Sequence, residues 1–164
     1  MSRVRHIAAV ALALTLASPQ LYAMRSSVEH RSLDAISLLD TMNRERIAHG
    51  LHPLRLNEKL TLAATDRMRD MFEKHYFNHK SPDGIDPFTW LDKRGYDYAA
   101  AGENLSVGYA TAEDIVDGWM KSPAHRVNVL NKHFDEVGVA VMAASPTSKR
   151  MGPTVVALYG TRRS

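Results

Sequence analysis

The sequence predicts an α+β domain in which helices cover a small antiparallel sheet. Apolar residues recur at helical spacing through most of the first 120 positions, and two apolar, β-branched segments without a helical period follow at residues 137–143 and 154–161. These two segments are expected to form an antiparallel pair, with a third strand near residues 104–108. This order, with helices first and strands concentrated later in the chain, is typical of an α+β domain.

The first helix is predicted from a capping box, in which Ser26 and Glu29 satisfy free backbone N–H groups at the helix start. Gly50 is placed to end it. We therefore expect an amphipathic helix between these limits. Its apolar face consists of Leu33, Ile36, Leu39, Met42 and Ile47.

Three more helices are predicted from polar residues that can accept a hydrogen bond from a free N–H group. These residues are Asn57, Asp86 before Pro87, and Thr111. His75 is expected to be a partly buried residue of the second helix. Ser122 and Pro123 are expected to end the fourth helix and to begin a short turn around His125.

The first 23 residues are predicted to be a secretory signal peptide. Arg3 and Arg5 precede an apolar run at residues 7–16, and cleavage is expected after Ala23. An uncleaved anchor is the alternative, because Leu21 is a less typical residue three positions before such a cut. The run is shorter than the roughly 20 residues of a membrane span, and no later stretch resembles one. We expect a single domain at residues 24–164, secreted or periplasmic.

The composition of the mature chain disfavours some partners. Cleavage removes two of the 21 basic residues and none of the 18 acidic ones, so the formal charge of +3 falls to +1. Charges are mixed along the chain without a basic stripe, which disfavours nucleic acid as a partner. The chain has no cysteine, so its stability is expected to come from an ordinary core rather than from disulfides. The sequence indicates no oligomeric state.

Three polar residues are candidates for a functional site: His79, Glu103 and His125. Each is expected in a short loop rich in Gly, Pro, Ser or Asn at the end of an apolar element, and firmly mounted loops often carry functional sites. Taken singly, each is more readily explained as a hydrogen-bonded structural residue. Neighbouring polar residues are candidates for binding: Ser81, Asn104, Ser122 and Asn128.

Taken together, these residues belong to motifs that occur in a fixed order. The motifs are His-x-Ser-Pro-Asp-Gly from His79, Gly-Glu-Asn around Glu103, Trp-x-x-Ser-Pro-x-His-Arg-x-Asn-x-Leu from Trp119, and Phe-x-x-Val-Gly-Val from Phe134. With these motifs and residues 39–54, the chain resembles the compact bacterial form of the CAP superfamily, which comprises cysteine-rich secretory proteins, antigen 5 and pathogenesis-related 1 proteins.

The resemblance implies an α-β-α sandwich with a large cleft. His79 and His125 would be the cleft histidines and Glu103 their acidic partner. Many eukaryotic relatives have a second cleft Glu where this chain has Ser122, so one position of the four-residue set differs here.

Two imidazoles beside a carboxylate can bind a zinc-like cation, so His79 and His125 are candidate ligands for Zn²⁺ or another divalent cation. His75 and His79 are four residues apart but lack the glutamate of the H-E-x-x-H pattern. No cofactor is required by the sequence.

Binding and hydrolysis both stay open. The favoured interpretation is a secreted module, not an enzyme, that binds a small ligand, a lipid or a partner protein, and it rests on analogy with the family. The alternative is a secreted hydrolase, protease-like or acting on cell walls, that uses His79, Glu103 and His125, with Ser81 as the nucleophile. Ser81 precedes Pro82 in a predicted turn, however, and the chain lacks a Gly-x-Ser-x-Gly elbow.

Overall fold

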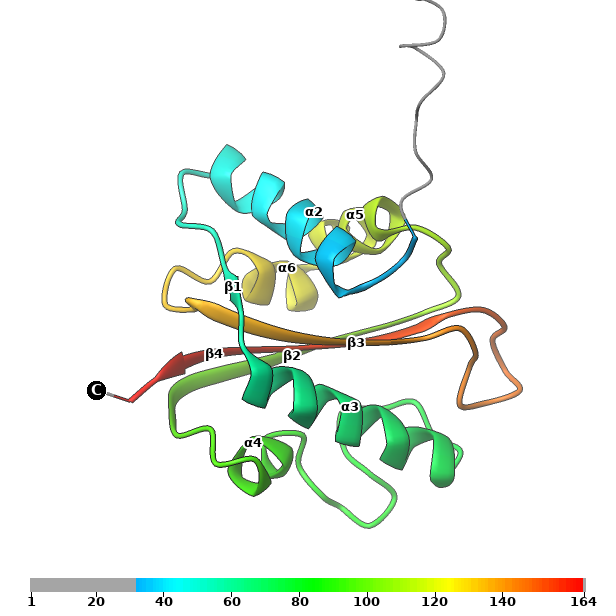
Figure 1. The fold of residues 1–164 in the computed structure, drawn as a ribbon. Coiled ribbons are helices and arrows are strands. Elements are labelled where there is room, and N and C mark those ends of the chain that lie inside the picture. Colours follow the sequence, from blue (N-terminus) through cyan, green and yellow to red (C-terminus); the bar gives the residue numbers. More distant parts are fainter. Residues whose placement is uncertain (1–31, 164) are drawn as a thin grey trace, which may run out of the picture. The chain divides into compact units, whose positions relative to one another are not determined.

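A four-stranded sheet lies between two layers of helices (Figure 1). The computed structural model describes residues 32–163, so the predicted signal peptide and the capping box of Ser26 and Glu29 lie outside the described residues. In chain order the elements are α2 (Ala35–Ala48), β1 (Arg55–Leu56), α3 (Glu58–Glu73), α4 (Thr89–Lys93), β2 (Tyr98–Val107), α5 (Ala112–Lys121), α6 (Pro123–Val129), β3 (Glu136–Met142) and β4 (Thr154–Arg162).

The sheet has the order β1-β3-β4-β2, which makes β2 an outer strand. The predicted antiparallel pairing of the last two strands is confirmed, and β2 also pairs antiparallel with β4. The third strand begins at Tyr98, earlier than expected. The sequence did not indicate this start, because the run of Ala and Gly before Glu103 has little intrinsic strand preference. The two-residue strand β1 pairs parallel with β3 and was not predicted, since two residues show no alternation.

Both faces of the sheet are buried, and β4 shows how one strand serves two cores. Val155, Ala157 and Tyr159 face α2, α5 and α6, whereas Val156 and Leu158 face α3 and α4. The helices α2, α5 and α6 cover one face in Figure 1, and α3 with α4 covers the other. The predicted α+β class, with a sheet between helical layers, is therefore confirmed.

The first described helix starts later than the sequence predicted. Residues 32–34 are not helical, and α2 begins after Asp34, whose side chain forms a capping box with Ser37. The predicted apolar face was also wrong in part, because Ile36 and Ile47 are 55% and 61% exposed. The buried face instead combines the apolar Leu38 and Met42 with three polar residues, which apolar spacing does not count: Ser37, Thr41 and Arg46.

The second and fourth predicted helices start where expected, with Asn57 and Thr111 as their N-caps. The prediction for His75 was wrong. The helix α3 ends at Glu73, and His75 is exposed with a positive φ of 53°. The short helix α4 begins two residues after Pro87, while Asp86 caps the preceding turn by accepting a hydrogen bond from the N–H of Phe88.

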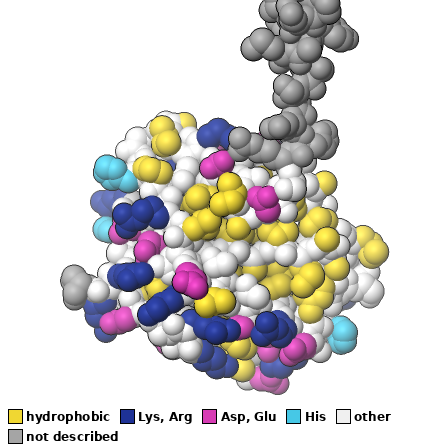
Figure 2. Space-filling model, in the orientation of Figure 1, with side chains coloured by type: hydrophobic (Ala, Val, Ile, Leu, Met, Phe, Trp, Pro, Cys, Tyr) yellow, Lys and Arg dark blue, Asp and Glu magenta, His cyan; other side chains and the backbone are white. Residues whose placement is uncertain are grey.

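The surface in Figure 2 carries basic and acidic side chains side by side, and hydrophobic side chains gather between α2 and α3. Within residues 32–163, no helix combines the length and the hydropathy needed to cross a membrane.

Candidate functional site

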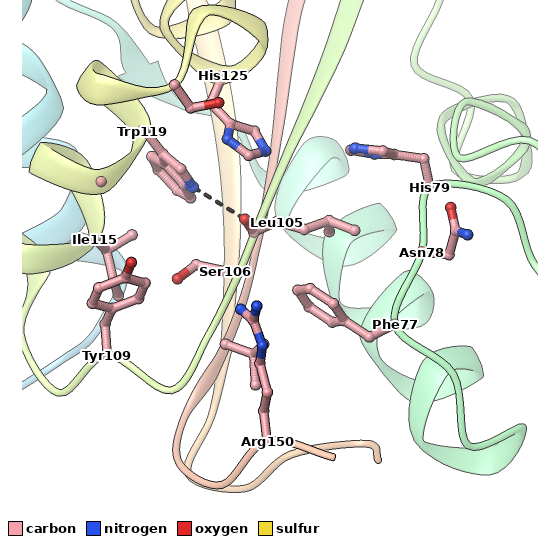
Figure 3. Close-up of a pocket in the computed structure, with 13 residues that line it drawn as sticks. Phe77, Asn78, His79, Leu105, Ser106, Tyr109, Ile115, Trp119, His125 and Arg150 are labelled. Atoms are coloured by element: carbon pink, nitrogen blue, oxygen red, sulfur yellow. Dashed lines mark hydrogen bonds between the residues drawn. The ribbon is translucent and has the colours of Figure 1, made fainter. Parts of the chain in front are cut away.

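A cavity of about 420 Å³ lies along the outer strand β2, between the two helical layers (Figure 3). Figure 3 shows His79 on the side of α3 and His125 on the side of α6, with the rings on opposite sides of β2. The structure thus brings the two predicted histidines to one cavity. Its wall is formed by Phe77, Asn78, His79, Leu105, Ser106, Val107, Tyr109, Ile115, Gly118, Trp119, Ser122, His125 and Arg150.

Glu103 lies inside strand β2 and not in the loop that the sequence predicted. Because alternate residues of a strand face opposite sides, Glu103 points toward α3 while Asn104 points toward α6. Glu103 is 5% exposed, and its Oε1 is 2.7 Å from Nδ1 of His79. An ionised carboxylate only accepts hydrogen bonds, so His79 donates from Nδ1, which leaves its Nε2 free for a ligand.

The other oxygen of Glu103 binds Arg67, a residue of α3 that sequence reasoning missed. Arg67 is fully buried, and its Nε donates to Oε2 of Glu103 over 3.1 Å. Its guanidinium also donates to the carbonyl oxygens of Asn78 and His79 and to the hydroxyl of Tyr76. One buried cation therefore holds both the carboxylate and the loop that carries His79. The available signal was a charged residue on the apolar face of a predicted helix.

A second network fixes His125, which lies in the helix α6 rather than in a turn. The side-chain amide of Asn104 is fully buried and donates to the backbone carbonyl of His125 over 3.1 Å. Asn128 donates to the carbonyl of Glu103 over 3.1 Å and to Oδ1 of Asn104 over 2.9 Å. A Cβ on Gly102 would lie 2.7 Å from Oδ1 of Asn128. The glycine thus allows α6 to approach β2.

The predicted binding residues divide into two groups. Ser122 lines the cavity, whereas Ser81, Asn104 and Asn128 are not among its lining residues. Ser81 is buried, and its Oγ accepts hydrogen bonds from the N–H groups of Asp83 and Ile85. This hydroxyl stabilises the turn after His79, and no hydrogen bond joins it to an imidazole within residues 32–163.

The two histidines have pKa values that move in opposite directions. The hydrogen bond to Glu103 raises the pKa of His79 above its ordinary value. Burial lowers the pKa of His125, and the nearby His79 lowers it further. At neutral pH the cavity therefore presents a neutral imidazole at His125 opposite a ring at His79 that holds its proton more firmly.

The donors at the cavity do not form a complete metal centre. Among the described residues, no group of three or more His, Asp or Glu side chains is placed to hold a metal ion. Glu103, the expected third donor, has one oxygen bound by His79 and the other by Arg67. A structural zinc ion takes four ligands. The protein side chains at this site therefore do not fit a closed zinc site.

Two further residues of the cavity were not predicted. Ser106, on β2, is 7% exposed, and its hydroxyl has no hydrogen-bond partner within the described residues. Arg150 enters from the loop between β3 and β4, and Figure 3 shows its guanidinium reaching toward Ser106 and Phe77. Strand alternation places Ser106 on the same side of β2 as Asn104, a signal that was available in the sequence. Nothing in the local sequence singles out Arg150.

The sequence and the fold are similar to those of known proteins. The sequence profile of the CAP family, described as the cysteine-rich secretory protein family, matches residues 39–159. The protein YkwD of Bacillus subtilis is 40% identical over 102 residues, which are 62% of this chain and 40% of YkwD. The chain thus corresponds to two fifths of the length of that relative.

Solved structures show the same fold. An extracellular protein of Bacillus anthracis that contains an SCP domain matches with a TM-score of 0.64 and 25% identity, over 77% of this chain and 39% of that one. An outer surface protein of Borrelia burgdorferi matches with a TM-score of 0.68 and 21% identity, over 82% of this chain and 99% of that one.

Proposed function

The chain belongs to the CAP family of cysteine-rich secretory proteins, and from that premise we propose that it is an exported binding module whose cavity between His79 and His125 holds a small organic ligand. The observation that carries this proposal is the buried hydroxyl of Ser106, which lines the cavity without a partner among the described residues. Buried polar groups are nearly always hydrogen-bonded. An unsatisfied one in the wall of a cavity of this size is therefore a position at which a ligand gains a hydrogen bond.

The rest of the cavity wall suits a binding role. Phe77, Leu105, Ile115 and Trp119 supply apolar surface, and the two imidazoles supply polar contacts. Ligand sites typically combine a mostly apolar lining with a few placed polar groups. The networks of Arg67 and Asn104 fix both histidines before any ligand arrives, which reduces the entropy cost of binding.

Export is supported by two observations. The first 23 residues have the pattern of a signal peptide, and the matching protein of Bacillus anthracis is described as extracellular. This part of the proposal is checked by expressing the full chain in a bacterial host and determining the N-terminal residue of the protein outside the cytoplasm. A mature N-terminus at Met24 supports it, and retention of the whole chain in the cytoplasm contradicts it.

Native mass spectrometry of the exported protein tests the binding role. We expect a non-covalent adduct on the wild type that is lost in Ser106→Val, because the added methyl groups occupy the cavity and the ligand loses its hydroxyl partner. Thr65→Val is the matched control, since Thr65 is exposed on α3 and lies outside this cavity. An adduct that survives in Ser106→Val would place the ligand elsewhere.

Hydrolysis is the second candidate, and the hydrogen bond between His79 and Glu103 favours it. A carboxylate that orients an imidazole is the arrangement by which a histidine acts as a general base toward water. Peptide, ester and cell-wall substrates form the test panel. A hydrolytic activity that falls in Glu103→Gln and in His125→Ala supports this candidate. Wild-type activity in both variants would show that neither residue takes part in the reaction.

A further inference from the structure

The cavity wall carries positive charge without negative charge. Its lining includes the cation Arg150 and two imidazoles, of which that of His125 is neutral at neutral pH, but no Asp or Glu among the described residues. Glu103, which binds His79, is not part of the wall, and its two carboxylate oxygens are bound by His79 and Arg67. A neighbouring hollow of about 770 Å³ shares Arg150 and adds Lys149, again without an acidic lining residue. A negatively charged ligand would thus meet no repelling carboxylate in either hollow.

Arg150 has no partner of its own. Across residues 32–163 its guanidinium makes no ion pair, hydrogen bond or ring contact. Arg44, Arg69 and Arg94 are also on the surface, and each of these pairs with a carboxylate. Guanidinium groups bind carboxylate, phosphate and sulfonate oxygens through two parallel N–H donors. The free guanidinium at the cavity therefore selects for an acidic group.

Ser106 provides a second, independent indication of a ligand. Its side chain is more than nine-tenths buried, lines the same cavity and lacks a hydrogen-bond partner among the described residues. Figure 3 shows Arg150 reaching toward this serine from the β3–β4 loop. The hydroxyl and the guanidinium both belong to the wall of one cavity, so both can donate to an acidic group that lies between them.

The apolar residues of the cavity wall indicate the chemistry of the rest of the ligand. Phe77, Leu105, Ile115 and Trp119 line the cavity with apolar surface, and their contacts favour a hydrophobic body. A volume of about 420 Å³ is in the range of sites for small organic molecules.

We propose that the ligand is an amphipathic organic anion whose acidic group binds Arg150 and Ser106 while its apolar body packs against Leu105, Ile115 and Trp119. This inference rests on the proposed binding function, because it names the class of ligand for the same cavity.

Two fluorescent probes that share one scaffold test the inference. 8-Anilinonaphthalene-1-sulfonate carries a sulfonate, and N-phenyl-1-naphthylamine is the same scaffold without it. We expect the wild type to bind the sulfonate probe more tightly than the neutral probe. Arg150→Gln should weaken binding of the sulfonate probe about fivefold, which is the effect of one solvent-accessible charge pair. The affinity for the neutral probe should not change. Lys132→Gln is the matched control, because Lys132 is exposed and lines a different hollow.

The outcomes separate this inference from the proposed function. If the wild type binds both probes equally, or if Arg150→Gln leaves the sulfonate probe unaffected, selection for an anion is wrong although the cavity still binds small molecules. If Lys132→Gln weakens the sulfonate probe and Arg150→Gln does not, the anion site lies at the other hollow. If neither probe binds, the proposed binding function itself fails. Ser106→Val should weaken binding of both probes, and this result would show that they occupy this cavity.

Discussion

Nδ1 of His79 lies 2.7 Å from Oε1 of Glu103, which joins a loop after α3 to the middle of strand β2. The two side chains differ in environment, because that of His79 is 54% exposed and that of Glu103 is 2% exposed. Glu103 is in turn held by the buried Arg67. The orientation of the exposed imidazole at the cavity is therefore set from inside the protein.

Replacing Glu103 with Gln should lower the pKa of His79. The hydrogen bond to the carboxylate is the largest cause of the raised pKa of His79, and a neutral amide stabilises the imidazolium less. NMR titration of the histidine ring protons measures this shift. Glu113→Gln is the control, since Glu113 is exposed and pairs with Arg44. Equal pKa values for His79 in the wild type and in Glu103→Gln would show that the hydrogen bond is absent in solution.

Removing the buried cation should destabilise the whole domain. Arg67→Met leaves the buried Glu103 without its ionic partner, and breaking a buried pair in this way costs about 3–5 kcal/mol. Urea unfolding measures the loss. Arg69→Met, two residues along the same helix, removes an exposed ion pair and should change the free energy of unfolding by less than about 1 kcal/mol. Similar losses in the two variants would contradict the central role of Arg67.

Most of the fold could be predicted because its signals are local. Asn57 and Thr111 cap their helices, and β-branched residues indicate β3 and β4. The errors come from features that local patterns do not encode. Strand β2 passes through Ala and Gly. The inner face of α2 includes Arg46, which is 1% exposed and donates to the carbonyl oxygens of Val129, Asn131 and Phe134.

Only some residues of the candidate site could be predicted from the sequence, and its geometry could not. His79 and His125 do line one cavity, yet Glu103 was expected in a loop and lies in a strand. Arg67, Ser106 and Arg150 were missed, because each gains its role from contacts with residues distant in the sequence.

Two glycines should respond oppositely to substitution by alanine. Gly138 lies on β3 against α3, where a Cβ would overlap the backbone of Leu60 and Thr61. Gly138→Ala should therefore lower the free energy of unfolding by about 1–3 kcal/mol or more, because the added methyl group overpacks the interface. Gly118 is inside α5, and its Cβ would meet only Tyr109 at an ordinary distance of 3.5 Å. Gly118→Ala should raise the free energy of unfolding by about 0.8–1 kcal/mol, because alanine has a higher helix propensity than glycine. Thermal unfolding of both variants checks the pair, and destabilisation by Gly118→Ala would contradict the packing of α5.

Zinc should bind weakly at this site. The two cavity histidines are not joined by a third side-chain donor within residues 32–163, so the binding free energy should be smaller than the roughly 10 kcal/mol or more of structural zinc sites. Calorimetry at neutral pH measures it, with His79→Ala and His125→Ala as controls. Tight binding that both variants abolish would show that the loops rearrange to complete a metal centre.

The location of the ligand is tested most directly by NMR mapping of a neutral probe. N-phenyl-1-naphthylamine is titrated into the ¹⁵N-labelled protein, and shifts are followed at the backbone of residues 105–107 and at the indole N–H of Trp119, which donates to the carbonyl of Leu105. The binding account predicts that the largest shifts occur at these positions and that Ser106→Val removes them. Shifts confined to residues 120–133, where a separate hollow lies, or no shifts at all, would contradict it.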